Sequence, residues 1–118
     1  MAAAMVSSAY VNTRGRADTK ASVAWRLPFG DSKILDFFLG ALTVDGLRHQ
    51  LQIHALRLIG NSCAETDENR ARVVQSNYLP AIIRCIQNDA TVPYAIPVLY
   101  NVLVDYGEFL LKTVCLAV

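Results

Sequence analysis

The sequence predicts an all-α protein built from repeated helical units, and three observations support this fold class. The 118 residues are 53% apolar and 18% charged, which is apolar enough for a chain that folds around a core. Residues 48–64 contain no Pro and a single Gly, which favours one long helix. Positions about 40 residues apart carry matching residue types, as in proteins built from tandem units. The length fits one domain or a part of one.

The first predicted element is a disordered or irregular leader over residues 1–30, followed by a folded segment over 31–118. Residues 1–24 are small and polar, with three cations and one acid. Such a composition occurs in mitochondrial transit peptides, but no apolar stripe lies opposite the cations, which favours a disordered leader. Trp25 and Phe29 either pack on Ile34 as an irregular cap or share this disorder.

A short helix is predicted next, beginning near Ser32. The run 34–39 is compact and apolar, and Asp31 and Ser32 are available to cap its first N–H groups. Residues 43–46 then form a turn-like break before the long helix.

The long helix over residues 48–64 is apolar on two faces rather than one. One row of apolar side chains comprises Leu51, Ala55, Leu58 and Ile59, and a second comprises Ile53, Leu56, Gly60 and Cys63. Both rows need cover, so we expect this helix to lie between neighbours. A narrow polar edge remains at helical spacing, made of Gln50, His54, Arg57 and Asn61.

Two shorter helices follow. Asp67 is placed to cap a helix that runs to residue 75, and Asn77 then turns the chain because Asn tolerates positive φ. Pro80 suits the first turn of a helix over residues 80–87.

The last predicted helix runs from Pro93 to about residue 106. Pro97 removes one backbone hydrogen bond, so it should bend this helix or delay its start by a turn. Gly107 is well placed to end it.

Part of the chain aligns with itself when Ala55 is placed on Ala95. The other matched pairs are Ile59 with Leu99, Asn61 with Asn101, Glu65 with Asp105, Glu68 with Glu108 and Val74 with Val114. Periods of about 40 to 47 residues with two or three helices each are typical of armadillo and HEAT solenoids. Stacking of such units would cover both flanks of the long helix and leave its polar edge in a concave groove.

The strings LRLIGNSCAETDENRARVV, NYLPAIIRCI and IPVLYNVLVDY resemble armadillo repeats. The residues that carry the resemblance are Glu68, Asn69, Arg70, Leu79, Pro80, Asn61 and Asn101. One departure is Asn77, where the family usually has Gly. The predicted fold is therefore an armadillo-type helical solenoid with about one full repeat flanked by partial repeats. We expect a truncated segment whose end faces, including residues 110–118, are adhesive on their own.

More narrowly, LIGNxCAxxxENRxxVV and IPVLYNxxVDY are similar to the fungal relatives of the small GTPase GDP-dissociation stimulator, over residues 47–106. The resemblance implies a guanine-nucleotide exchange factor whose partner is a small GTPase of the Rho or Ras type. In that family the basic, prenylated tail of the GTPase is held while its nucleotide pocket is loosened.

Composition and motifs argue against several other classes. A formal net charge of +1 gives no basic face for nucleic acid, and uncharged runs such as 96–104 are much shorter than the roughly 18 residues of a membrane span. Cys63, Cys85 and Cys115 match neither a disulfide framework nor zinc-ligand spacing, which favours a reduced, cytoplasmic protein.

The sequence also lacks GxGxxG, GxxxxGK[ST], GxSxG and HExxH motifs, which argues against an enzyme. His49 and His54 are five residues apart and lie on different helix faces, so they do not form a metal pair. Ser62 and Cys63 lie near His54 without an orienting carboxylate. We therefore predict no catalytic residue, no metal and no cofactor.

The candidate partner-binding groove is the repeated polar edge. Its residues are Gln50, His54, Arg57, Asn61 and Glu65 in one unit, and Tyr94, Asn101 and Asp105 in the next. Asn amides one repeat apart can grip the backbone of an extended peptide, and the two carboxylates would favour a basic segment. The alternative is structural: the Asn side chains bond the backbone of a neighbouring repeat, and the acids cap loops.

The sequence thus predicts a protein-interaction module that binds a small GTPase or another protein with a basic extended segment. Two alternatives remain: a generic armadillo scaffold, and a nuclear-import-type peptide carrier. The carrier would need Trp four residues before each Asn to hold Lys side chains, and these positions carry Arg57 and Pro97.

Overall fold

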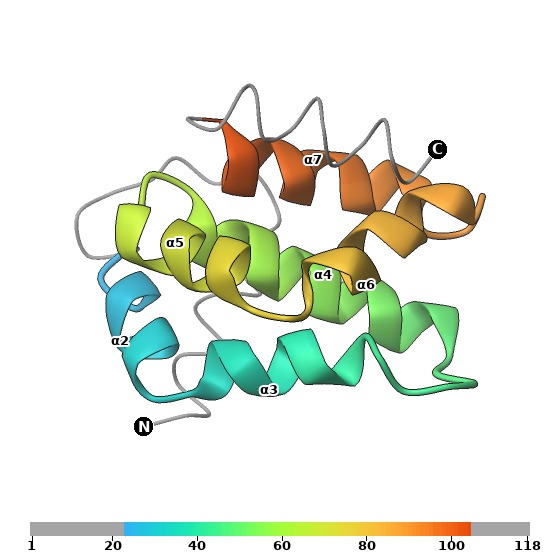
Figure 1. Cartoon of the computed structure of the whole chain (residues 1–118), viewed down its shortest axis with the longest axis horizontal. Coiled ribbons are helices and arrows are strands. Elements are labelled where there is room, and N and C mark those ends of the chain that lie inside the picture. The colour runs from blue at the N-terminus through green and yellow to red at the C-terminus, as the bar shows by residue number, and fades with distance from the viewer. Residues whose placement is uncertain (1–22, 105–118) are drawn as a thin grey trace.

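The computed structural model describes residues 23–104, which fold entirely into helices and connecting turns (Figure 1). In chain order these are α2 (Arg26–Asp31), α3 (Ile34–Ala41), α4 (His49–Cys63), α5 (Asp67–Gln75), α6 (Leu79–Arg84), the 3-10 turn η1 (Cys85–Gln87) and α7 (Val92–Leu103). No strand occurs in this part of the chain. The all-α prediction is confirmed.

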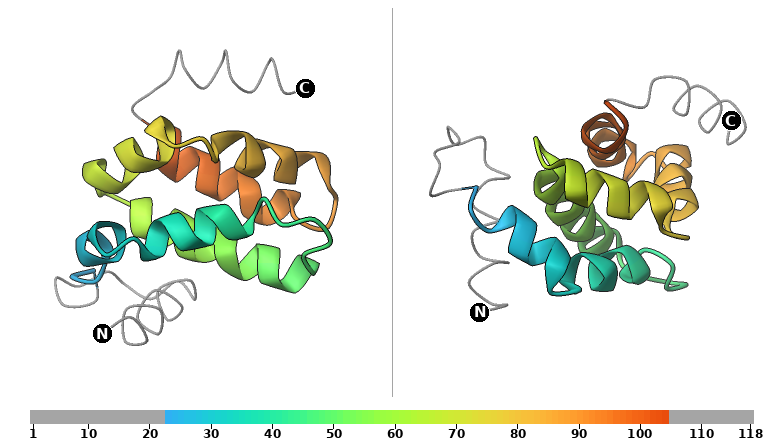
Figure 2. Two further views of the ribbon diagram at one scale, coloured as in Figure 1. Left: turned by 60° about the horizontal axis from the view of Figure 1, so that its bottom comes forward. Right: turned by 60° about the vertical axis from the view of Figure 1, so that its left-hand side comes forward.

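The helices form two groups of three, each with two short helices followed by a long one. Figure 2 shows α2–α4 and α5–α7 as neighbouring halves of the described region. The long helix α4 makes its most extensive contact with α7 and its next with α3. This position explains why α4 is apolar on two faces.

The apolar residues of both groups meet in one core. Its fully buried members include Leu35 and Leu39 of α3, Leu56 and Ile59 of α4, and Val102 and Leu103 of α7. Leu51, which the sequence places in one of the apolar rows of α4, stays 51% exposed.

The prediction of a leader up to residue 30 is wrong for its last residues. Residues 26–31 form α2, in which Phe29 is fully buried, packs edge-on against Trp25 and stacks on Phe38 of α3. Burial of these aromatic rings stabilises a helix that contains Pro28 and Gly30 and has little helix propensity of its own. Residues 1–22 lie outside the described region.

The prediction that Asp31 and Ser32 cap the start of α3 is also wrong. Lys33, with φ 72°, precedes α3 and turns the chain between α2 and α3. Asp31 instead pairs with Arg72 of α5, and the Ser32 hydroxyl donates to the carbonyl of Phe29, closing the end of α2.

The predicted N-cap of α5 and the predicted left-handed turn at Asn77 also differ from the structure. Thr66, not Asp67, occupies the N-cap of α5, and Asp67 accepts a hydrogen bond from Arg70 within the first turn. Glu65, with φ 51°, makes the left-handed turn after α4, whereas Asn77 has no positive φ. The sharp reversal is needed at the end of the long helix, and Glu65 occupies that position.

The boundaries of the remaining helices agree closely with the prediction. Pro80 lies in the first turn of α6, and η1 extends that element to residue 87. Helix α7 begins at Val92 and continues through Pro97, so the proline does not delay its start. The predicted end near residue 106 and the stop at Gly107 lie outside the described residues.

The surface of α7 that faces away from α4 is apolar. Ile96 and Tyr100 are 57% and 67% exposed, and Val104 continues the same row at four-residue spacing. Within residues 23–104, no helix combines the length and the hydropathy needed to cross a membrane.

Candidate binding groove

The two helical groups are joined at the C-terminal end of α4 by a buried polar network. The side chain of Asn69 on α5 is fully buried, and its amide nitrogen donates to the carbonyls of Arg26 (2.6 Å) and Ser62 (2.8 Å). Arg70 donates through Nε to the carbonyl of Cys63 at 3.0 Å. Ser62 and Cys63 end α4, so the bonds to their carbonyls satisfy acceptors that lack intrahelical donors, whereas the bond to Arg26 ties α5 to the start of α2.

Arg72 and Gly30 complete this network, which we call the Asn69 junction (Gly30, Asn69, Arg70 and Arg72). Arg72 donates to the Asn69 amide oxygen at 2.8 Å and also pairs with Asp31. A Cβ atom on Gly30 would lie 1.9 Å from that amide oxygen and 2.3 Å from the Arg72 guanidinium. The absence of a side chain on Gly30 is therefore what lets α5 approach α2 so closely.

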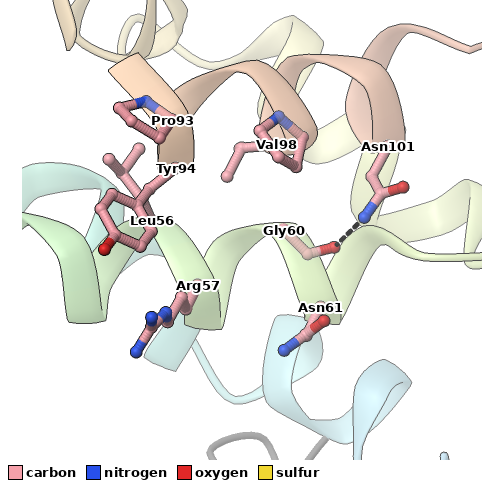
Figure 3. Close-up of a pocket in the computed structure, with 9 residues that line it drawn as sticks. Leu56, Arg57, Gly60, Asn61, Pro93, Tyr94, Val98 and Asn101 are labelled. Atoms are coloured by element: carbon pink, nitrogen blue, oxygen red, sulfur yellow. Dashed lines mark hydrogen bonds between the residues drawn. The ribbon is translucent and has the colours of Figure 1, made fainter. Parts of the chain in front are cut away.

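The junction fixes α4 against the second group, and α7 then lies along α4 in the same direction. Gly60 on α4 faces Val98 on α7, and a Cβ on Gly60 would lie 3.0 Å from the Val98 Cγ2 atom. Asn101, one turn after Val98, donates through Nδ2 to the Gly60 carbonyl at 3.2 Å (Figure 3). The missing side chain on Gly60 brings the two helices into close contact.

A groove of about 200 Å³ opens between these two helices (Figure 3). The α4–α7 groove is lined by Leu56, Arg57, Gly60 and Asn61 of α4 and by Pro93, Tyr94, Pro97, Val98 and Asn101 of α7. It is therefore built from both long helices. Neither helical group could form it alone.

Arg57 lies against the aromatic ring of Tyr94, with its guanidinium carbon 4.9 Å from the ring centroid. Figure 3 shows the two side chains together at one end of the groove, with Asn61 one turn along α4 from Arg57. This cation–π contact holds the guanidinium across the two helices and orients it at the groove.

Four of the eight predicted binding residues line this groove: Arg57, Asn61, Tyr94 and Asn101. Gln50 is exposed and His54 half-buried, and neither lines the groove. Glu65 is exposed in the turn after α4 and does not line the groove. Asp105 lies outside the described residues.

The structural alternative for the repeated Asn residues applies to Asn101, because its amide nitrogen bonds the backbone of the neighbouring long helix. Sequence reasoning missed the part that Asn69 plays, although Asn69 belongs to the ENR string. The signal that could have identified it is an Asn in the first turn of the helix that follows a long helix, where an amide can reach the free carbonyls of that helix end.

The groove also carries an uneven charge. The sequences of α4, HQLQIHALRLIGNSC, and α7, VPYAIPVLYNVL, contain no Asp or Glu. Arg57 is their sole Lys or Arg. The helices that form the groove therefore present one fixed positive charge and no fixed negative charge.

The Cys63, Cys85 and Ser62 side chains lie buried outside the groove. Burial raises the pKa of the Cys63 thiol to about 12, and burial likewise raises the pKa of Cys85. The Ser62 hydroxyl donates to the carbonyl of Ile59 at 2.8 Å. Residues 23–104 contain no cluster of three or more His, Cys, Asp or Glu side chains that could hold a metal ion.

A comparison with known proteins finds no matching family model, no similar curated protein and no similar solved structure.

Proposed function

We propose that this chain is a non-enzymatic protein-interaction module that binds an extended segment of a partner protein in the α4–α7 groove. The observation that carries the proposal is the groove itself. It gathers Arg57, Asn61, Tyr94 and Asn101 from two helices that are separated by about one sequence period. Amide and guanidinium groups beside an apolar floor suit the backbone and side chains of a bound peptide.

We further propose that the two helical groups are consecutive units of an armadillo-type solenoid. Three features support this: each group runs short, short, long; the two long helices lie side by side in the same direction; and α5 repeats the position of α2 at the start of its group. In such a stack the groove between successive long helices is where a partner binds.

For the partner, the resemblance of the ENR and IPVLYN strings supports a small GTPase of the Rho or Ras type. An exchange factor accelerates GDP release because it binds the nucleotide-free GTPase more tightly than the GDP-loaded form. A nuclear-import-type carrier has less support, since the Tyr94 ring already carries the Arg57 guanidinium of the same chain.

The test uses the purified full chain with purified Rho-type and Ras-type GTPases, each GDP-loaded and nucleotide-free. We expect binding that favours the nucleotide-free form, and faster release of a fluorescent GDP analogue. Tyr94→Ala should weaken binding about tenfold, because it removes the ring that positions Arg57. Arg84→Gln, which changes an exposed residue outside the groove, is the control.

Binding to neither nucleotide state would contradict the exchange-factor proposal and leave the scaffold as the better interpretation. Binding that Tyr94→Ala leaves unchanged would place the partner elsewhere on the surface.

A further inference from the structure

We infer that the α4–α7 groove selects its partner by a carboxylate: Arg57, held against Tyr94, receives an Asp or Glu side chain of an extended peptide segment. This inference rests on the proposed function and specifies the chemistry of the ligand. It is opposite in sign to the basic segment that the sequence predicts.

The helices that form the groove carry one fixed charge, and it is positive. Arg57 is the one Asp, Glu, Lys or Arg residue of α4 and α7. A basic side chain in this groove would meet like charge and no carboxylate on either helix. An acidic side chain would meet opposite charge in a partly enclosed site, where water screens the attraction less than at an open surface.

The contacts of the Arg57 guanidinium leave it available to an acidic ligand. Within residues 23–104 it makes no salt bridge, and its contact is with the face of the Tyr94 ring. A guanidinium has five N–H donors, and contact with a single ring leaves donors available for another acceptor. A carboxylate accepts two parallel hydrogen bonds from a guanidinium, and the contact with Tyr94 has already restricted the side chain.

The groove also offers oxygen atoms that can accept hydrogen bonds from the backbone N–H groups of a peptide. Pro97 has no N–H, so the carbonyl of Pro93, one turn earlier on α7, lacks its usual helical donor. Asn101 uses its amide nitrogen on Gly60, which leaves the amide oxygen as the acceptor on that side chain. Both residues line the groove and are suited to accept backbone N–H groups of an extended segment.

Apolar lining completes the description of the ligand. The exposed rings of Pro93 and Pro97 provide a surface for an uncharged side chain beside the carboxylate, and the buried Leu56 and Val98 lie beneath it. The carboxylates on which the opposite expectation depended are not in the groove: Glu65 does not line it, and Asp105 lies outside the described residues. The ligand class is therefore an extended segment with an acidic residue next to an apolar one.

The experiment selects peptides of about twelve residues from a displayed random linear library against the immobilised full chain, a length suited to an extended segment. We expect Asp and Glu to be enriched about threefold or more over the unselected library. The best peptide is then synthesised in two forms, one with the acidic residue and one with the corresponding amide, and the affinity of each is measured by fluorescence anisotropy. The amide form should bind about tenfold more weakly.

Substitutions in the protein complete a double-mutant cycle. Arg57→Gln should weaken binding of the acidic peptide about tenfold and remove the difference between the acidic and amide forms. Arg57→Lys, which keeps the charge and loses the planar fork, should give an intermediate affinity. Arg84→Gln removes an equal charge outside the groove and should change affinity less than about twofold. Circular dichroism of each variant checks that the helices are retained.

Selection of Lys-rich or Arg-rich peptides would overturn the inference and leave the proposed groove function intact. The same holds for acidic peptides whose affinity does not depend on Arg57. If the folded protein selects no peptide at all, both the inference and the proposed function fail, so the two failures are distinguishable.

Discussion

The Asn69 junction and the α4–α7 groove use the same residue types, Asn and Arg, in opposite ways. At the junction, Asn69 is fully buried, and its amide nitrogen and oxygen both bond partners within the chain. In the groove, Arg57 is half-buried and its guanidinium lies over the Tyr94 ring, which leaves N–H donors for other acceptors. A fully bonded polar network holds the helical groups together, whereas a partly used one is available to a ligand.

Asn69→Ala should destabilise the junction more than any other substitution considered. The change removes three hydrogen bonds and leaves the carbonyls of Arg26 and Ser62 without this donor, so we expect a loss of about 3 kcal/mol in the free energy of unfolding. Urea denaturation followed by circular dichroism measures it. Asn77→Ala, at an exposed position, is the matched control and should cost less than about 0.5 kcal/mol. Equal losses for the two variants would show that the junction contributes nothing special.

Gly30→Ala tests the same junction by crowding it. A Cβ there would lie 1.9 Å from the Asn69 amide oxygen, so we expect a loss of about 2 kcal/mol, although Ala is the better helix former. At Gly40, the nearest atom, the Tyr78 hydroxyl oxygen, would be 3.7 Å from an added Cβ. Gly40→Ala should therefore be neutral or stabilising by up to about 1 kcal/mol in thermal melts. If both alanines stabilise the protein, the close approach at Gly30 is not a constraint.

Alkaline pH should destabilise the fold through Cys63, whose carbonyl belongs to the bonds of the junction. Burial raises the pKa of its thiol from the ordinary 9.0 to about 12, so the unfolded chain loses this proton at lower pH than the folded chain. Stability from this group is complete below pH 9 and is lost as pH rises toward 12. Between pH 7 and 10 we expect a loss of about 1.4 kcal/mol in the free energy of unfolding. Cys63→Ala should remove that part of the pH dependence, and an identical pH profile for the variant would contradict this assignment.

The smallest expected effect on the free energy of unfolding comes from a substitution in the groove. Arg57→Gln should change the free energy of unfolding by less than about 0.5 kcal/mol, because the residue is half-exposed and loses one cation–π contact. The measurement is the same urea titration. A loss several times larger than this would make Arg57 a structural residue and weaken its assignment to ligand binding.

The positions of most helices could be predicted because local signals mark them. The long helix, α5 and α6 were located to within one residue at nearly every boundary, since Gly, Pro and the spacing of apolar residues act within a few positions. Helix α2 could not be predicted. Its sequence, RLPFGD, is a poor helix former, and it depends on the burial of Phe29 and on the bond from Asn69, which is 43 residues away.

Part of the candidate site could also be predicted from the sequence. The sequence repeat brings Asn61 and Asn101 to the same groove, as expected. The sequence does not indicate where along α4 its neighbour begins. The α4 residues that line the groove begin at Leu56, so Gln50 and His54 lie before it along the helix.

Gly60 determines how closely α4 and α7 approach each other beside the groove. Its single hydrogen in place of a methyl group sets the separation of the two axes, since an added carbon would press against Val98. A larger residue at this position would overpack the buried contact and push α7 away from α4, so the cleft would widen with a loss of stability.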